Sequence, residues 1–346
     1  MPTHKVRFVP VNIEIDVNED ETVLNAAFRQ GVSLTHGCRE GQCGACKSFL
    51  LDGDLEMKKY STFALPEYES DEGYVLLCRS HVYSDAEVEL INYDEDILRL
   101  GIPIETFKTT IEAIEPLTHD IRRLVLKLTE PERRLRFNAG QYMSLRLPDS
   151  EEYRAYSMAN TPRITDRLEF IIKVFPGGRF SGLLDGGFTI GQEVEAKGPY
   201  GVFMLREKYD TDIVCVGGGS GMAPLWSLLN DMAERGVKRK ATYFYGARTR
   251  KDLFYLEQLH QLGERLPDFR FIPALSMATA EDAWDGETGL ITEVIERNLA
   301  DNQTHTQAYL CGPPPMIDAA IPVLVRKGIS EDRIFFDKFT PTGAAE

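Results

Sequence analysis

The chain has 346 residues, of which 43% are hydrophobic, so it can bury real cores, and its length favours two or three domains. Its 54 acidic and 39 basic residues give a net charge of −15, which disfavours binding to nucleic acid or to an anionic membrane surface. The longest uncharged run, residues 213–230, is interrupted by four glycines and a proline and therefore does not predict a membrane span.

The first hundred residues predict short strands and one helix around a cysteine loop. Residues 5–17 alternate as two strands about a turn, and residues 21–30 predict a short helix that ends at Gly31. Further strands are expected within residues 73–80 and 86–93. The first 17 residues contain no apolar segment of the export-signal kind, so we expect neither export nor lipid anchoring.

The cysteines of this region predict an iron-sulfur site. Their C-x4-C-x2-C…C spacing is typical of plant-type [2Fe-2S] clusters, in which iron prefers soft thiolate ligands. Gly37, Gly41 and Gly44 suit a loop that wraps closely around such a cluster. Structural zinc usually has two close ligand pairs, and a disulfide framework suits a short secreted chain, so both alternatives are disfavoured. The expected ligands are Cys38, Cys43, Cys46 and Cys78.

Three further expectations follow from this region. With four of the six cysteines committed to a cluster, the cysteine usage fits a reducing, cytoplasmic compartment. His36, beside Cys38, is expected to be a hydrogen-bonding loop residue and not a ligand. Residues 1–98 carry 19 acidic and 8 basic side chains, so most of the negative charge lies here and could steer association with a basic partner face. Plain solubility explains any single acidic group equally well.

The alternation of apolar and polar residues is interrupted at residues 94–104, which we interpret as a linker. From Phe107 onward the sequence predicts longer alternating strands. Strands are expected within residues 109–117, 121–128, 140–148 and 167–175, and their spacing favours a small antiparallel barrel.

Two segments of this barrel look like a flavin site. In residues 154–160, RAYSMAN, an arginine can match a pyrophosphate, an aromatic ring can lie against isoalloxazine, and a hydroxyl can bond its N5 atom. In residues 176–181, PGGRFS, a glycine turn opens a helix whose free amides would attract phosphate. Alone, R-x-Y-S is a weak match, and Tyr156 could be an ordinary half-buried barrel aromatic. Together with residues 198–201, GPYG, the segments predict FAD.

The last third predicts a nucleotide-binding α/β domain. A buried strand at residues 212–216 runs into GGGSGMAP at residues 217–224, the strand, glycine turn and helix of a phosphate-binding crossover. Strict G-x-G-x-x-G is not met, because Met222 and Pro224 fall where a third glycine or alanine is expected, so a standard Rossmann dehydrogenase is disfavoured. Strands within residues 241–248, 269–276, 307–314 and 333–339 alternate with helices at 256–266 and 315–328, which indicates a doubly wound parallel sheet.

With these motifs, the chain resembles the NADH-dependent reductase components of bacterial oxygenases, in which a plant-type ferredoxin is joined to a ferredoxin-NADP reductase-like module. Its closest likeness is to reductases of soluble diiron monooxygenases that oxidise methane, propane or alkenes, including the ending FFDKF at residues 335–339. The resemblance implies a multidomain fold. Its parts are a β-grasp [2Fe-2S] ferredoxin domain (α+β) at residues 1–98, a linker at 99–106, an antiparallel β-barrel FAD domain at 107–208 and an α/β doubly wound parallel-sheet nicotinamide domain at 209–346.

The resemblance also implies residue roles. Ser157 is expected at flavin N5, Tyr156 at the flavin ring and Arg154 at the pyrophosphate. Cys311 would lie near the nicotinamide C4 atom and Phe339 over the flavin face, although Cys311 could be a small buried strand-end residue and Phe339 a core aromatic. Asp337 stands where related reductases often carry Glu, which leaves its role open. The remaining expected cofactor contacts are Gly178, Ser181, Gly218, Gly219, Gly221, Pro224 and Gly312.

The cofactors imply a relay. NADH releases two electrons as hydride, whereas a [2Fe-2S] cluster accepts one at a time, and FAD bridges the mismatch. We therefore expect single electrons to reach the hydroxylase of a diiron monooxygenase, with docking through the acidic ferredoxin domain of a monomeric chain. The acceptor could instead be a Rieske dioxygenase or a P450, or the chain could be a redox-responsive regulatory protein. Residues 245–251 are basic, so electrostatics alone would allow NADPH, while the resemblance favours NADH.

Overall fold

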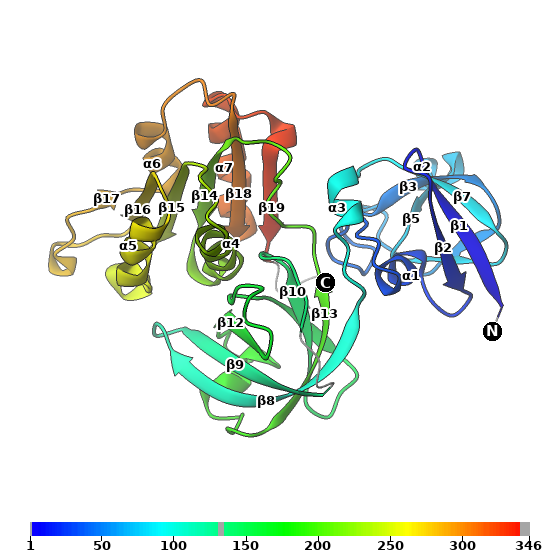
Figure 1. The fold of residues 1–346 in the computed structure, drawn as a ribbon, viewed down its shortest axis with the longest axis horizontal. Helices are drawn as coiled ribbons and strands as arrows, with labels where there is room; N and C mark the ends of the chain where they lie inside the picture. The colour runs from blue at the N-terminus through cyan, green and yellow to red at the C-terminus, as the bar shows by residue number, and fades with distance from the viewer. Residues whose placement is uncertain (1, 131–134, 340–346) are drawn as a thin grey trace. The chain divides into compact units, whose positions relative to one another are not determined.

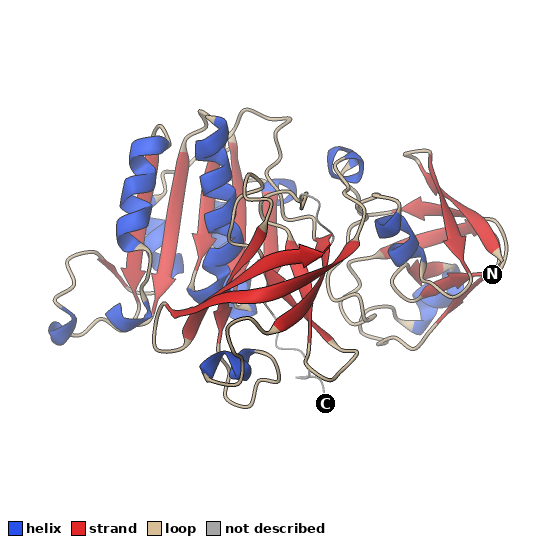
Figure 2. Ribbon diagram, turned by 60° about the horizontal axis from the view of Figure 1, so that its bottom comes forward, coloured by secondary structure: helices blue, strands red, loops and turns tan. Residues whose placement is uncertain are grey.

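A computed structural model describes residues 2–130 and 135–339. The chain divides into two compact units, one of residues 1–106 with 198–202 and the other of residues 107–197 with 203–346. Figure 1 follows the chain through both, and Figure 2 colours the same elements by type. No helix among the described residues combines the length and apolar character needed to cross a membrane.

The first unit contains the expected β-grasp fold. Its five-stranded sheet has the order β2-β1-β7-β3-β5, with β1 antiparallel to β2 and parallel to β7. Helix α1 buries most of its apolar side chains, and the Thr22 side chain caps it by accepting from the amide of Asn25. Part of the expected linker forms helix α3. The bounds are β1 (Thr3–Val9), β2 (Ile13–Asn18), α1 (Val23–Arg29), β3 (Lys47–Asp52), β4 (Leu55–Met57), α2 (Glu67–Glu72), β5 (Tyr74–Leu76), β6 (Ser80–Val82), β7 (Ala86–Leu90) and α3 (Glu95–Arg99).

The second unit begins with an antiparallel barrel. Its described strands follow the order β11-β10-β13-β8-β9-β12, and a bridge between Met158 and Phe170 links the two edges. Inward-facing side chains such as Leu124, Leu126 and Phe170 are fully buried and form the barrel core. The bounds are β8 (Glu105–Pro116), β9 (Ile121–Glu130), β10 (Tyr142–Arg146), β11 (Tyr153–Ser157), β12 (Arg167–Lys173), η1 (Ser181–Asp185) and β13 (Glu193–Tyr200).

The rest of this unit is a doubly wound parallel sheet with the order β17-β16-β15-β14-β18-β19. Alternate residues of β14 face two different cores, one shared with α4 and α5 and the other with α6 and α7, so helices cover both faces. Figure 1 shows these helices beside the sheet. The bounds are β14 (Asp212–Gly217), η2 (Gly219–Gly221), α4 (Met222–Arg235), β15 (Ala241–Ala247), η3 (Arg250–Asp252), α5 (Leu256–Arg265), β16 (Phe269–Leu275), η4 (Ala280–Asp282), β17 (Glu287–Thr288), α6 (Ile291–Asn298), β18 (Thr306–Gly312), α7 (Pro314–Arg326), η5 (Glu331–Arg333) and β19 (Ile334–Lys338).

The barrel and the parallel sheet share one core. Ile121, Ala159 and Ile171 of the barrel pack with residues of β14, α4 and α5 in a single buried cluster. The Ser227 hydroxyl of α4 also donates to the carbonyl of Asn160, at 2.6 Å. The expected boundary between residues 208 and 209 is therefore a change of topology within one packed unit, and the three-domain division stays a prediction.

Candidate functional site

The four cysteines lie as two neighbouring pairs. Cys38 is paired with Cys43, and Cys46 with Cys78. The backbone amides of Glu40 and Gln42 donate to the Cys38 sulfur at 3.4 and 3.2 Å, and the Cys38 amide donates to the Cys43 sulfur at 3.3 Å. Thiolates are the form that binds iron, and no disulfide ties up these cysteines in the described chain. The four residues therefore fit a [2Fe-2S] cluster, and their assignment as its ligands stays a prediction.

Glycines make this close approach possible. Gly41 and Gly44 have φ angles of +72° and +70°, which side chains rarely adopt. A Cβ atom on Gly37 would lie 2.9 Å from the Cys43 sulfur, and one on Gly44 would lie 2.9 Å from the carbonyl oxygen of Ala64. The loop thus has no room for side chains at these positions.

His36 agrees with its expected hydrogen-bonding role. Its Nδ1 atom lies 2.8 Å from the carbonyl oxygen of Leu34, and its ring packs edge-on against Phe28 with centroids 4.6 Å apart. Burial lowers the pKa of His36 to about 4, so the ring is neutral at physiological pH.

A second group of residues meets where the barrel joins the parallel sheet. Cys311 of β18 is the register partner of Asp337 in β19 and of Gly217 in β14. The hydroxyl of Ser157, at the end of β11, donates to the Asp337 carboxylate. Ser157 is 6% exposed and Cys311 is fully buried. The structure therefore brings Ser157, Cys311 and Asp337 together from three separate strands.

The electrostatics of this junction centre on Asp337. Burial raises the pKa of Asp337 to about 6, an effect that the Ser157 hydrogen bond partly offsets. Burial also raises the pKa of Cys311 far above its usual range, so this thiol stays protonated. Cys311 is thus a neutral, packed side chain and not a nucleophile. Phe339 follows β19, donates its amide to the carbonyl of Gly312 at 2.9 Å and packs partly against the shared core.

The glycine turn after β14 lies against the neighbouring strands. A Cβ atom on Gly218 would lie 2.6 Å from the Gly246 carbonyl oxygen, and one on Gly221 only 2.2 Å from that of Cys311. Gly219 has a φ of +56° and more open surroundings. Packing alone therefore requires glycine at two of these positions, while Gly219 remains available for close approach of a ligand. Pro224 is buried in the first turn of α4.

The residues expected at the flavin lie on two neighbouring segments. The ring of Tyr156 packs on Phe180 with centroids 5.3 Å apart and belongs to the edge of the barrel core. The Ser181 hydroxyl accepts from the amide of Phe175, and a Cβ atom on Gly178 would lie 2.3 Å from that hydroxyl. The expected helix here is the five-residue 3-10 turn η1. Arg154 and Arg179 both donate to the carboxylate of Glu152. Arg179 belongs to the segment PGGRFS, but the sequence analysis gave it no role.

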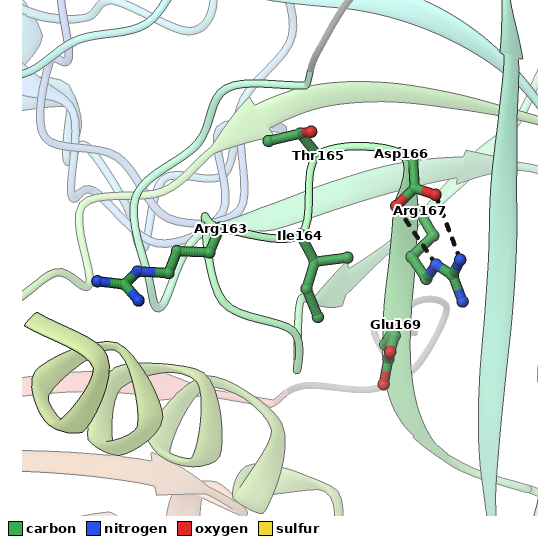
Figure 3. Close-up of a pocket in the computed structure, with 6 residues that line it drawn as sticks. All are labelled: Arg163, Ile164, Thr165, Asp166, Arg167 and Glu169. Atoms are coloured by element: carbon green, nitrogen blue, oxygen red, sulfur yellow. Dashed lines mark hydrogen bonds and ion pairs between the residues drawn. The ribbon is translucent and has the colours of Figure 1, made fainter.

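A surface hollow lies away from these residues. An open cavity of about 360 Å³ precedes and flanks the start of β12, and Figure 3 shows its ion-paired lining. Asp166 pairs with Arg167, and Arg163 donates to the carbonyl of Glu234. None of the expected site residues lines it, so we assign it no role. The lining residues are Arg163, Ile164, Thr165, Asp166, Arg167 and Glu169.

A cluster of possible metal ligands also forms at the surface. Ligand atoms of His119, Asp120 and Asp252 lie within 4.8 Å of one another. Lys173 Nζ lies 3.1 Å from Asp120, and Arg248 Nη2 lies 3.5 Å from Asp252. These cations already balance the carboxylates, so the cluster needs no metal ion.

Comparison with known families assigns a cofactor to each part of the chain. Residues 7–83 match the 2Fe-2S iron-sulfur cluster binding domain, and residues 108–205 match the oxidoreductase FAD-binding domain. Residues 215–321 match the oxidoreductase NAD-binding domain. The expected fold class and the three cofactor types are thereby confirmed.

Several known proteins match the chain along nearly its whole length. The chain is 51% identical to the reductase component of propane 2-monooxygenase from Mycolicibacterium goodii, over 98% of this chain and 97% of that one. It is 36% identical to the reductase component of phenol 2-monooxygenase from Pseudomonas sp. strain CF600, over 97% and 94%. Among solved structures, the Amycolatopsis cytochrome P450 reductase superposes with a TM-score of 0.87 at 31% identity, covering 98% and 99%. The chain therefore belongs to the family of ferredoxin-fused, FAD- and NAD-binding reductase components of multicomponent monooxygenases.

Proposed function

We propose that this chain takes electrons from NADH through FAD and delivers them singly, through its [2Fe-2S] cluster, to the hydroxylase of a diiron monooxygenase that oxidises alkanes or alkenes. The observation that carries the proposal is the 51% identity with a propane 2-monooxygenase reductase along nearly the whole of both chains. The paired cluster cysteines and the junction of Ser157, Cys311 and Asp337 support it independently.

The residues of the chain perform binding and orientation, while the bound cofactors supply two-electron acceptance from NADH and one-electron transfer. Cys38, Cys43, Cys46 and Cys78 would hold the cluster. The Asp337 carboxylate accepts from Ser157 and so fixes the hydroxyl at the end of β11. Cys311 fills its buried position beside Asp337 without adding a charge. Gly219 leaves open backbone where a dinucleotide pyrophosphate would approach.

The preference for NADH is supported by the loop after β15. Arg250 donates to the carbonyls of Asp282 and Ala283, and Arg248 lies 3.5 Å from the Asp252 carboxylate. Both guanidinium groups therefore have partners within the protein. A ribose 2′-phosphate would have to compete for them, which favours the cofactor that lacks this phosphate.

We also propose that the hydroxylase docks on the ferredoxin domain, close to the cluster loop. The amide of Ser61 donates to the carbonyl of Gly41 at 2.9 Å, which ties the segment that carries Phe63 to that loop. Phe63 is 90% exposed, and the acidic helix α2 follows it. An exposed aromatic beside acidic groups would suit a partner face with an apolar centre and a basic rim.

The remaining proposals concern the state of the chain. We propose that it acts as a monomer in the cytoplasm, where a reducing environment keeps cysteine ligands as thiols until the cluster forms.

A P450 acceptor is the second candidate, because the likeness to a P450 reductase also extends over the whole chain. Reconstitution with purified oxygenase components separates the two. With NADH in excess, we expect product from a propane-oxidising diiron hydroxylase at a rate that saturates with this chain. Turnover of a P450, or of a Rieske dioxygenase, with none from any diiron hydroxylase would contradict the proposal.

A further inference from the structure

Two arginines of the flavin-binding barrel share one carboxylate. Arg154 Nη2 donates to Glu152 Oε2 at 3.1 Å, and Arg179 Nη1 donates to the other oxygen, Glu152 Oε1. Arg154 is also tied to its own strand, because its Nη1 atom donates to the carbonyl of Tyr153 at 2.9 Å. Glu152 thus bridges the start of β11 and the glycine turn, two segments that lie 27 positions apart in the chain.

The bridge stands next to the aromatic residue expected at the flavin ring. Arg154 and Tyr156 alternate along β11 and therefore share one face of the strand. Tyr156 packs on Phe180, the residue that follows Arg179. The two guanidinium groups and the aromatic ring accordingly belong to one continuous site, with Arg154 partly buried and Arg179 more exposed.

The carboxylate is held weakly enough to be displaced. The Glu152 side chain is 50% exposed, and ion pairs between exposed side chains contribute little to stability. Hydrogen bonds from Arg179 and Arg154 lower the pKa of Glu152, so it is ionised at neutral pH. A pyrophosphate carries more charge and more acceptor oxygens than one carboxylate, and guanidinium groups match it bidentately.

We propose that Glu152 is a resident counter-ion that holds Arg154 and Arg179 together and exchanges for the pyrophosphate of FAD when the flavin binds. Glu152 is then a positioning residue that also competes with the cofactor, and Arg179 is a second pyrophosphate-binding residue beside Arg154. The inference rests on the proposed function only in requiring that this barrel binds FAD.

The affinity of the purified holoprotein for FAD tests this directly, because free FAD fluoresces more strongly than bound FAD and its release on dilution gives the dissociation constant. Removing the competitor in Glu152→Gln should tighten binding up to about fivefold, the range of one exposed ion pair. Removing a charge-assisted contact in Arg179→Gln should weaken binding at least about tenfold. In the double variant, the gain from Glu152→Gln should become smaller, since Arg179 is gone and only Arg154 is left to be released.

A matched control separates this exchange from the general effect of charge. Glu151→Gln removes the same charge from the adjacent position, where the side chain pairs with Arg146 and not with the two arginines of the bridge. Substitutions at exposed positions that take no part in a site have small effects. This variant should therefore keep the FAD dissociation constant within about twofold of the wild-type value.

Three outcomes would overturn the inference. They are weaker FAD binding by Glu152→Gln, equal effects of Glu151→Gln and Glu152→Gln, and an Arg179→Gln variant that binds FAD like the wild type. A wild-type protein that holds no FAD would instead refute the proposed function. The variants lie in the second unit, so a circular-dichroism melting curve of each variant, compared with that of the wild type, recognises a folding failure separately.

Discussion

At the scale of single residues, Asp337 is a carboxylate next to a member of the shared core, because its register partner is Cys311. It lies half-buried between Ser157 and Cys311, and burial raises its pKa to about 6. In the unfolded chain the same group titrates near 3.8. Between these values the folded protein holds a proton that the unfolded chain has released, so this residue's contribution to stability falls as the pH rises from about 4 to about 6.

Asp337→Asn should remove that dependence. The neutral amide avoids the cost of a buried charge, so the melting temperature of the variant relative to the wild type should rise between pH 4 and pH 7. The difference in unfolding free energy should be at most about 3 kcal/mol, the value of two pKa units. Scanning calorimetry across this range measures it, with Asp268→Asn as a control at an exposed turn. A pH-independent difference for Asp337→Asn would show that the carboxylate is not destabilised by the fold.

At the scale of elements, the glycine turn between β14 and α4 is shaped as much by packing as by ligand binding. Gly218 touches the end of β15, and Gly221 touches the end of β18, where Cys311 and Gly312 lie. The turn therefore holds the ends of three neighbouring strands in register at the edge where such sheets bind ligands.

Gly221→Ala should displace the end of β18. The new Cβ atom would lie 2.2 Å from the carbonyl oxygen of Cys311, a rigid backbone group, and overpacking of this kind costs about 1–3 kcal/mol. We expect a lower melting temperature and slower NADH-driven ferricyanide reduction. The control is Gly263→Ala in α5, whose Cβ atom would meet its nearest neighbour at 3.7 Å and should stabilise the helix by about 0.5–1 kcal/mol. Wild-type melting behaviour for Gly221→Ala would refute the packing argument.

At the scale of the whole molecule, the chain separates a cluster-binding unit from a unit that holds the flavin and nicotinamide sites. The second unit is held together by one core that Ile121 and Ile171 of the barrel share with α4. The same division appears in the charge, because most of the net negative charge lies in residues 1–98. The division in fold and charge thus matches the division between the cluster-binding part and the FAD- and NAD-binding parts of the chain.

Features fixed by local pattern could be predicted from the sequence. The cysteine spacing identified the cluster loop, and the alternation within residues 121–128 and 167–175 identified strands β9 and β12. The sequence analysis did not predict helix α6, because this short segment follows a long loop. Its apolar residues at 291, 294 and 295 do have helical spacing.

Features that depend on distant contacts could not be predicted. The hydrogen bond between Ser157 and Asp337 joins residues 180 positions apart, and no periodic pattern encodes it. The ion pairs of Glu152 with Arg154 and Arg179 depend on where the loop before β11 places the Glu152 carboxylate. The core shared between the barrel and the sheet is also invisible locally, because Ile121 and Ala159 read as ordinary barrel residues.

The central claim is that electrons enter at the nicotinamide and flavin sites and leave from the cluster. Its most direct test compares two activities of Cys43→Ser, which removes one cluster ligand: NADH-driven ferricyanide reduction and NADH-driven turnover of the hydroxylase. Cys215→Ala, a buried cysteine of β14 outside the cluster loop, is the control that should retain both. The account predicts that Cys43→Ser keeps ferricyanide reduction and loses hydroxylase turnover. Equal loss of both activities, or retention of both, would contradict it.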